Sequence, residues 1–377
     1  MKKRTVCLIA LMFAMTMALT GCSVGNSVNN SAEAANVDGV SIPLGEVNFY
    51  LRYQQTQMAM YSGYFGEDFM NQDLMGTGTI YGETVKDTVV QTLEEYYLVE
   101  AHAEDIGISL TDEDKAAAEE AADAFLAAND SKTLQAMSAD KETVTHVLGL
   151  MALQNKAYAD RAATIDTNVT DEEAAQKTIT YVRSSTNGTT DENGDTVDLT
   201  DEELAAKKDV LNQIRDEAGA DGDLDAAAEN HDLSAVTTSY GADDENLNAD
   251  VKAAAETLSD GEYADIVEGD NAYYLVRMDS TFDREATDNH KQVILTQRER
   301  DAYTAWVDSL KENADITTND DALAKLTFER VFTQTSAEDT SEDAAAEDAS
   351  EETDENADST DESADTSEAD EAEENAQ

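Results

Sequence analysis

Cysteine and basic side chains are scarce in this chain of 377 residues. Its two cysteines are Cys7 and Cys22, and Cys7 falls in a segment that we expect to be removed, so no disulfide is expected. Lys and Arg number 24 against 83 Asp and Glu, which gives a formal net charge of −59. Because such a surface repels phosphate groups, nucleic acids and anionic lipid headgroups are excluded as partners.

Catalytic signatures are scarce as well. The chain has no Cys-x-x-Cys pair and no Walker loop. His102 and His146 fall in expected helices without the spacing of metal ligands, and acidic pairs are too frequent in so acidic a chain to indicate a site. We therefore expect neither a cofactor nor a metal ion.

The N-terminus has the pattern of an export signal. Lys2, Lys3 and Arg4 precede an uncharged run from Val6 to Leu19, which is shorter than the ~20 residues of a spanning helix. The run ends in Leu-Thr-Gly-Cys22, which resembles the lipobox of bacterial lipoproteins. The resemblance implies cleavage before Cys22 and acylation of that residue, for example with palmitate. A plain secretory signal is the alternative.

Helical periodicity dominates the chain up to about residue 170. Thr84 to Ile106 places Val85, Val89 and Leu93 on one face and is followed by Gly107, so a long helix is expected there. Methionine and aromatic residues crowd the stretch before it: Tyr50, Tyr53, Met58, Met60, Tyr61, Tyr64 and Phe65. Such residues can bind varied apolar segments, although packing in a core is the alternative.

Strand-like and helix-like runs alternate in the next hundred residues. Lys177 to Ser185 and Ala272 to Met278 read as strands, as does Val236 to Tyr240. Leu204 to Ala218 and Val251 to Leu258 read as helices. A further helix is expected from Lys291 to Ala314, with Trp306 as a core anchor, and the acidic segment 336–377, which has no apolar stripe, is expected to be disordered.

This order of elements, with the phrase Leu258-Ser-Asp-Gly-Glu262 before the last hairpin, resembles the parvulin-type peptidyl-prolyl isomerase domain. That family has a histidine in its first strand and another in its last. The resemblance assigns these positions to Thr180 and Tyr274, so it leaves open whether the domain isomerises proline bonds. Candidates for a peptide-binding cleft are Tyr181, Tyr240, Tyr263, Tyr273 and Met278.

The flanking segments resemble the PrsA-type foldase lipoproteins and the chaperone SurA. The resemblance implies an α+β fold: an α-helical body like the SurA N-terminal domain, an inserted parvulin-like α/β module, and a long C-terminal helix that completes the body. The expected divisions are a signal peptide (1–21), a flexible tether (22–36), the body (37–170), the module (171–284), the C-terminal helix (285–316), an ambiguous segment (317–335) and the acidic tail (336–377).

The implied function is that of a foldase on the extracytoplasmic face of the bacterial cell membrane, anchored by lipid at Cys22. Its partners would be unfolded, secreted polypeptides. The alternative is a non-catalytic envelope lipoprotein that binds a ligand or acts as a scaffold.

Overall fold

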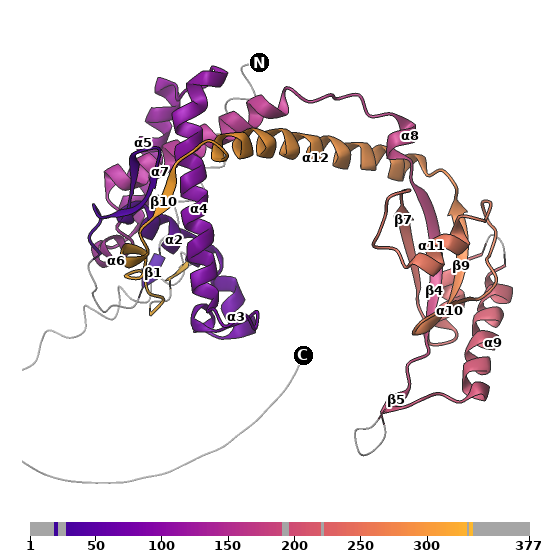
Figure 1. Cartoon of the computed structure of the whole chain (residues 1–377). Helices are drawn as coiled ribbons and strands as arrows, with labels where there is room; N and C mark the ends of the chain where they lie inside the picture. Colours follow the sequence, from indigo (N-terminus) through magenta and orange to yellow (C-terminus); the bar gives the residue numbers. More distant parts are fainter. Residues whose placement is uncertain (1–18, 22–27, 191–195, 220–221, 330–331, 335–377) are drawn as a thin grey trace, which may run out of the picture.

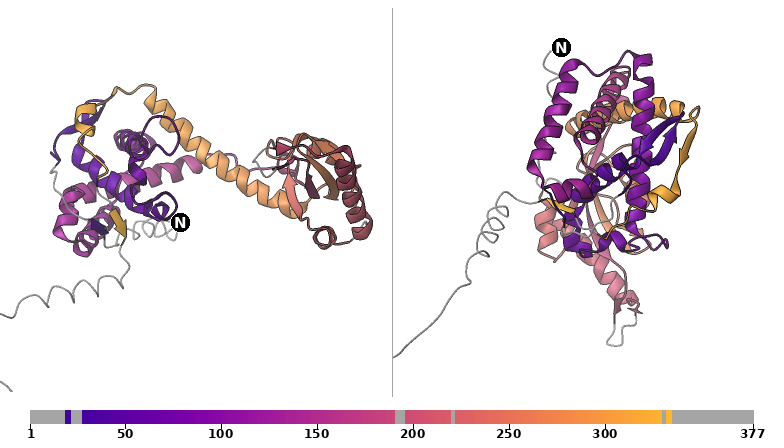
Figure 2. Two further views of the ribbon diagram at one scale, coloured as in Figure 1. Left: turned by 90° about the horizontal axis from the view of Figure 1, so that it is seen from below. Right: turned by 90° about the vertical axis from the view of Figure 1, so that its left-hand side faces the viewer.

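The computed structural model describes residues 19–21, 28–190, 196–219, 222–329 and 332–334 (Figure 1). Cys22, most of the expected signal peptide and the acidic tail lie outside these residues. A helical body and a small α/β module lie at opposite ends of one long helix, α12 (Arg284–Lys311), in Figure 1 and in the left view of Figure 2. The predicted α+β fold, a helical body with a small α/β module, is confirmed.

The body is built from helices around a small sheet. Its helical elements are α2 (Leu44–Gln57), η2 (Ala59–Tyr61), α3 (Ser62–Phe65), η3 (Phe69–Asn71), α4 (Tyr81–His102), η4 (Ala103–Ile106), α5 (Asp112–Ala128), α6 (Ser131–Ala136) and α7 (Lys141–Ala162). The sheet has the order β10-β2-β3, from Ile316–Thr318, Glu33–Val37 and Val40–Pro43. Phe49 and Phe125 meet edge to face at 5.6 Å in the core, which joins α2 to α5.

One segment differs from the sequence-based expectation, and a second was left open by the sequence. The flexible tether was expected to reach residue 36, but Glu33–Val37 is a strand whose Ala34 and Ala35 are buried in the body. The ambiguous segment 317–335 returns to the same core: it forms α13 (Asp320–Leu323), and Leu326 and Phe328 are buried. Phe332–Gln334 (β11) pairs with Leu19–Gly21 (β1). Apolar side chains from residues 34–35 and 326–328 therefore complete the body.

The module is a four-stranded antiparallel sheet in the order β7-β4-β9-β8. These strands are Ala235–Tyr240, Lys177–Ser185, Ala272–Ser280 and Val267–Gly269. A short helix, α11 (Ala249–Ala255), covers one face, while α9 (Asp201–Ala218) and α10 (Leu224–Glu229) cover the other. A hairpin of two short strands, β5 (Thr189–Thr190) and β6 (Thr196–Val197), projects from the module.

The chain passes between body and module twice, through α8 (Asp171–Ala174) and back through α12. Tyr303 and Val307 near the end of α12 are buried against α4 and α7, and Trp306 is half-buried beside them. Among the described helices, none has both the length and the apolar character needed to cross a membrane.

Candidate functional site

The module's sheet presents two different faces because side chains alternate along each strand. Ile179 and Tyr181 of β4 lie with Tyr274 and Val276 of β9 on the face that α11 covers. Val182 of β4 instead packs with the side chains of α9 and α10 on the other face. Each candidate side chain can therefore be assigned to one face.

Thr180 and Tyr274, which the resemblance assigns to the family's two histidine positions, lie on opposite faces of the sheet and do not meet in one pocket. In the antiparallel register Thr180 pairs with Arg277, whereas Tyr274 pairs with Arg183. The buried Thr180 hydroxyl donates to Asp279 Oδ2 at 2.5 Å and shares a hydrogen bond with Thr237 Oγ1 at 2.7 Å. The physical reason is the strand period of two: a shift of one residue moves a side chain to the other face.

Tyr181 is the residue of β4 that meets Tyr274. Their ring centroids are 6.1 Å apart and the rings are inclined at 63°, an edge-to-face contact. Residues of these two strands meet on one face only where the register of the pair places them there, and the neighbouring strand sets that register. The resemblance alone placed Tyr181 among the peptide-binding candidates but not at the family's histidine position.

The face under α11 is packed rather than open. Tyr240 is 1% exposed and Tyr274 is 6% exposed, and both pack with Met278, Val251 and other apolar residues against α11. Burial raises the pKa of the Tyr240 hydroxyl above its usual range, so it stays neutral at physiological pH. Three of the proposed cleft residues, Tyr181, Tyr240 and Met278, thus pack into this core.

The remaining two candidates lie on the other face. Tyr263 donates its hydroxyl hydrogen to the Gly219 carbonyl at 2.9 Å, and Arg277 lies over its ring. Tyr273 is buried with the α9 and α10 side chains, and Lys208 Nζ lies 4.6 Å from its ring centre. The five predicted cleft residues are therefore divided between the two faces and do not line one cleft.

An acidic hollow of about 870 Å³ lies where the module meets α12. Lys177 and Glu256 pair across part of it at 2.6 Å, which lowers the pKa of Glu256. Its other charged lining residues are mostly acidic: Glu172, Glu173, Asp243, Asp244, Glu245 and Lys252. Nowhere in the described residues do three His, Cys, Asp or Glu side chains converge in a way that could hold a metal ion.

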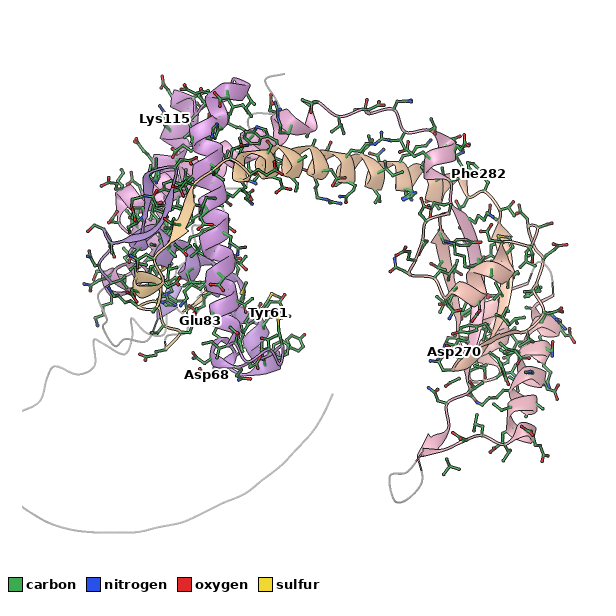
Figure 3. All side chains as sticks on the ribbon, viewed as in Figure 1. Tyr61, Asp68, Glu83, Lys115, Asp270 and Phe282 are labelled. Atoms are coloured by element: carbon green, nitrogen blue, oxygen red, sulfur yellow. The ribbon has the colours of Figure 1, made fainter. Side chains whose placement is uncertain are left out.

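The body carries an uncharged surface of a different kind. A groove of about 200 Å³ between α2 and α4 is lined by Tyr50, Gln54, Met58, Tyr81, Thr84, Val85, Thr88, Val89 and Thr92. Beyond it, the side chains of Met60, Tyr64 and Phe65 are 72%, 84% and 50% exposed. Residues 53–66 contain no charged side chain, although charged residues make up 28% of the chain. Tyr61, in the same stretch, lies near the N-terminal end of α4 on the side facing the module (Figure 3).

Residues 189–288 match the family model described as the PPIC-type PPIASE domain. This part of the chain is therefore similar to a PPIC-type domain. The predicted resemblance to the parvulin family is confirmed by this match. The strand β4, which carries Thr180 and Tyr181, precedes the matched residues but belongs to the same four-stranded sheet of the module.

Several solved structures are similar to about two thirds to four fifths of the chain. The foldase protein PrsA from Lactococcus lactis is 18% identical, covers 78% of this chain and 97% of its own, and has a TM-score of 0.31. A PrsA peptidylprolyl isomerase from Bacillus cereus is 16% identical, with coverages of 67% and 96% and a TM-score of 0.30. PrsA from Bacillus subtilis is 16% identical, with coverages of 79% and 99% and a TM-score of 0.20. None of the curated proteins matches the chain.

Proposed function

We propose that this protein is an extracytoplasmic foldase that holds non-native segments of secreted polypeptides. The observation that carries the proposal is the PPIC-type domain of residues 189–288 on a helical body with an uncharged, exposed methionine and aromatic surface. Methionine and aromatic side chains adapt to varied apolar segments, and such a surface is otherwise a liability in water.

The test is whether the chain delays the aggregation of an unfolded secreted protein. We expect light scattering during dilution of the client from denaturant to rise later and less when the chain is present in equimolar amount. A matched variant with Met60, Tyr64 and Phe65 each changed to Ser should be weaker, because these exposed side chains are not needed for the core. Unchanged scattering with the native chain would favour a ligand-binding or scaffold lipoprotein instead.

The PPIC-type domain is proposed to bind peptide without accelerating prolyl isomerisation. Rotation about the amide has a barrier of ~18–20 kcal/mol, and lowering it requires a pocket that accepts the proline ring. On the face under α11, Tyr181 and Tyr274 instead meet edge to face and pack with apolar side chains. In a protease-coupled assay with a proline peptide, we expect a rate equal to that in buffer; a clear acceleration would refute the proposal.

Anchoring through Cys22 is the third part of the proposal. The sequence Leu-Thr-Gly-Cys22 after an uncharged run supports acylation, and two or more acyl chains would hold the protein stably at the membrane surface. In the producing bacterium, labelled palmitate should enter the native chain but not a Cys22→Ser variant. The variant should also leave the membrane fraction; equal labelling of both chains would contradict the anchor.

A further inference from the structure

One edge of the module's sheet is a strand without a second neighbour. Among the described residues, β7 pairs only with β4, so its other side presents backbone N–H and C=O groups without a strand to bond them. The strand is six residues long and reads Ala-Val-Thr-Thr-Ser-Tyr, without charge and without proline. Val236, Thr237 and Ser239 are exposed. Such an edge can serve as a template for pairing with another chain.

Other edges in the described structure are protected in the ways that proteins ordinarily use. At the opposite edge of the same sheet, β8 has three residues, and its Glu268 forms an ion pair with Lys208 at 2.5 Å. In the body's sheet, β3 ends with Pro43 and β10 has three residues. The longer, uncharged β7 has none of these protections beyond its first residue, where the Ala235 N–H donates to Asp225 Oδ1 at 3.0 Å, which indicates that the rest of its edge is kept available.

The position of β7 suits a segment that also contacts the body. In Figure 1, β7 is the module strand nearest to the body, and its open edge lies on the inner side of the arch formed with α12. Tyr61 lies near the N-terminal end of α4, on the side of the body that faces the module (Figure 3). An extended chain between the two parts would meet a strand edge at one end and an uncharged apolar surface at the other.

Charges at the ends of β7 argue against a second copy of this chain as the occupant. Asp232 lies just before the strand, and Asp243, Asp244 and Glu245 follow it. If two β7 edges paired antiparallel, the acidic end of one copy would lie beside the acidic start of the other, which is unfavourable. A strand with basic residues beside an uncharged centre would be attracted instead.

We propose that the outer edge of β7 accepts an extended, uncharged segment of a non-native polypeptide as an additional strand of the module's sheet. Main-chain hydrogen bonds supply the affinity in this mode of recognition, and side chains contribute mainly to selection. This inference rests on the proposed foldase function, because it names the chain segment that the domain would hold: a β-prone stretch flanked by Lys or Arg.

The first test uses a labelled peptide that alternates Val and Thr over six residues and carries Lys at both ends. Two further versions carry N-methyl groups on alternate residues: one on the odd-numbered residues of the peptide and the other on the even-numbered residues. An added strand directs only one set of N–H groups toward its neighbour. We expect fluorescence anisotropy with the full chain to give at least tenfold weaker binding for one methylated set and near-native binding for the other. Equal binding of all three peptides would overturn the proposal.

Hydrogen exchange locates the binding on the native chain without any substitution. Amides within Val236–Tyr240 should gain protection when the unmodified peptide binds, whereas those of β8 (Val267–Gly269) should not change. Protection elsewhere with none in β7 would refute the inference. As a supporting variant, proline at Thr237 or at Thr238 blocks the edge; whichever variant keeps the native far-ultraviolet circular dichroism should bind the peptide at least tenfold more weakly.

The aggregation assay separates failure of this inference from failure of the proposed function. If the chain delays aggregation but the peptide gives no protection in β7, the foldase function stands and the edge is not its binding site. If the peptide protects β7 but aggregation is not delayed, the edge binds strands and the foldase function fails. If the peptide gives no protection in β7 and aggregation is not delayed, both the edge-binding inference and the proposed foldase function fail.

Discussion

His146 lies between two carboxylates in the body. Its Nδ1 is 2.8 Å from Glu46 Oε1, and its Nε2 is 3.7 Å from Glu100 Oε1. Tyr97 donates a hydrogen bond to Glu46 Oε2 at 2.9 Å and meets the imidazole ring edge to face. The carboxylates of Glu100 and Glu46 raise the pKa of His146 to about 10, so the ring is an imidazolium at neutral pH.

This raised pKa predicts a pH-dependent contribution to stability. Because the folded pKa lies above the ordinary value of 6.5, the contribution is complete below pH 6.5 and is lost as the pH rises through about 10. Relative to His146→Gln, the native chain should be more stable at pH 6 and should lose that advantage by pH 10. Urea unfolding followed by the fluorescence of Trp306, which packs on the body, measures the difference. A difference that stays constant with pH would contradict the prediction.

Gly82 offers a second prediction at the scale of single residues. A Cβ at this position would lie 2.5 Å from Phe328 Cδ2 and 2.8 Å from the Met70 carbonyl oxygen. Gly82→Ala should therefore lower the free energy of unfolding by about 1–3 kcal/mol, the usual cost of overpacking. Gly149→Ala in α7 is the matched control: its Cβ would meet only Leu110 Cδ1 at 3.4 Å, and it should stabilise by about 0.5–1 kcal/mol. Equal effects of the two changes would show that the close approach to Phe328 is relaxed at little cost.

Single residues also show how far the sequence could predict the site. Tyr240 and Met278 were candidates for the peptide-binding cleft, and both are buried. Hydrophobicity cannot distinguish an apolar cleft from a core, because both are lined by the same side chains. Thr180 was misplaced for another reason: the face of a side chain depends on strand register, which the neighbouring strand determines.

At the scale of elements, helix starts are local and were predictable. Thr111, Thr170 and Thr200 are each followed three residues later by an acid, and each threonine hydroxyl accepts a hydrogen bond from that residue's backbone N–H. At Thr111 and Thr200 the acid also accepts from the threonine N–H, which completes a capping box. These signals need only four neighbouring residues, so the sequence contains all of them.

The Thr111 cap gives a prediction for α5. Thr111→Ala removes the acceptor for the Asp114 N–H and should lower the free energy of unfolding of the body by about 1 kcal/mol. Thr111→Ser keeps a hydroxyl in the same place and should lie within a few tenths of a kcal/mol of the native chain. Urea unfolding followed by Trp306 fluorescence compares the three. Equal loss in both variants would indicate that the threonine methyl, rather than the cap, is what stabilises α5.

Pairings between distant elements were not predictable in the same way. Strand β10 bonds with β2 across nearly the whole chain, with Ile316 opposite Val37. Three-residue strands carry too little periodicity to be recognised, and their stability comes from the neighbour that they pair with. For the same reason, the burial of Leu326 and Phe328 in the body followed from tertiary packing and left no sequence signal beyond their apolar character.

At the scale of the whole molecule, the order of the parts was predictable but their arrangement was not. The order follows from composition and from the alternation of strands and helices. The arrangement depends on contacts where the outgoing chain lies along α12. There the buried Thr287 hydroxyl accepts a hydrogen bond from the Gln176 N–H at 3.1 Å, and Asp283 accepts one from Thr178 at 2.7 Å. Each contact joins residues more than one hundred positions apart.

Ion pairs also link the outgoing chain to α12, and they give a prediction about how the module is held relative to the body. Asp171 pairs with Arg284 at 2.7 Å and with Lys291 at 2.5 Å, and these cations lower its pKa. Glu173 pairs with Arg298 at 2.5 Å. Exposed pairs of this kind each contribute only about 0–1 kcal/mol, so Asp171→Asn combined with Glu173→Gln should barely change the unfolding of the body.

The double variant should instead change the distance between the two parts. With the pairs removed, α12 is held against the outgoing chain by hydrogen bonds such as those of Thr287, Asp283 and His290, and we expect the module to sample a wider range of orientations. Small-angle X-ray scattering should then show a broader distribution of interatomic distances than for the native chain, and added salt should shift the native chain toward the variant. Asp123→Asn, which breaks the exposed pair with Lys141 inside the body, is the control and should leave the distribution unchanged. If the double variant scatters like the native chain, the hydrogen bonds between α12 and the outgoing chain are sufficient to fix the arrangement of body and module, and the ion pairs are not needed for it.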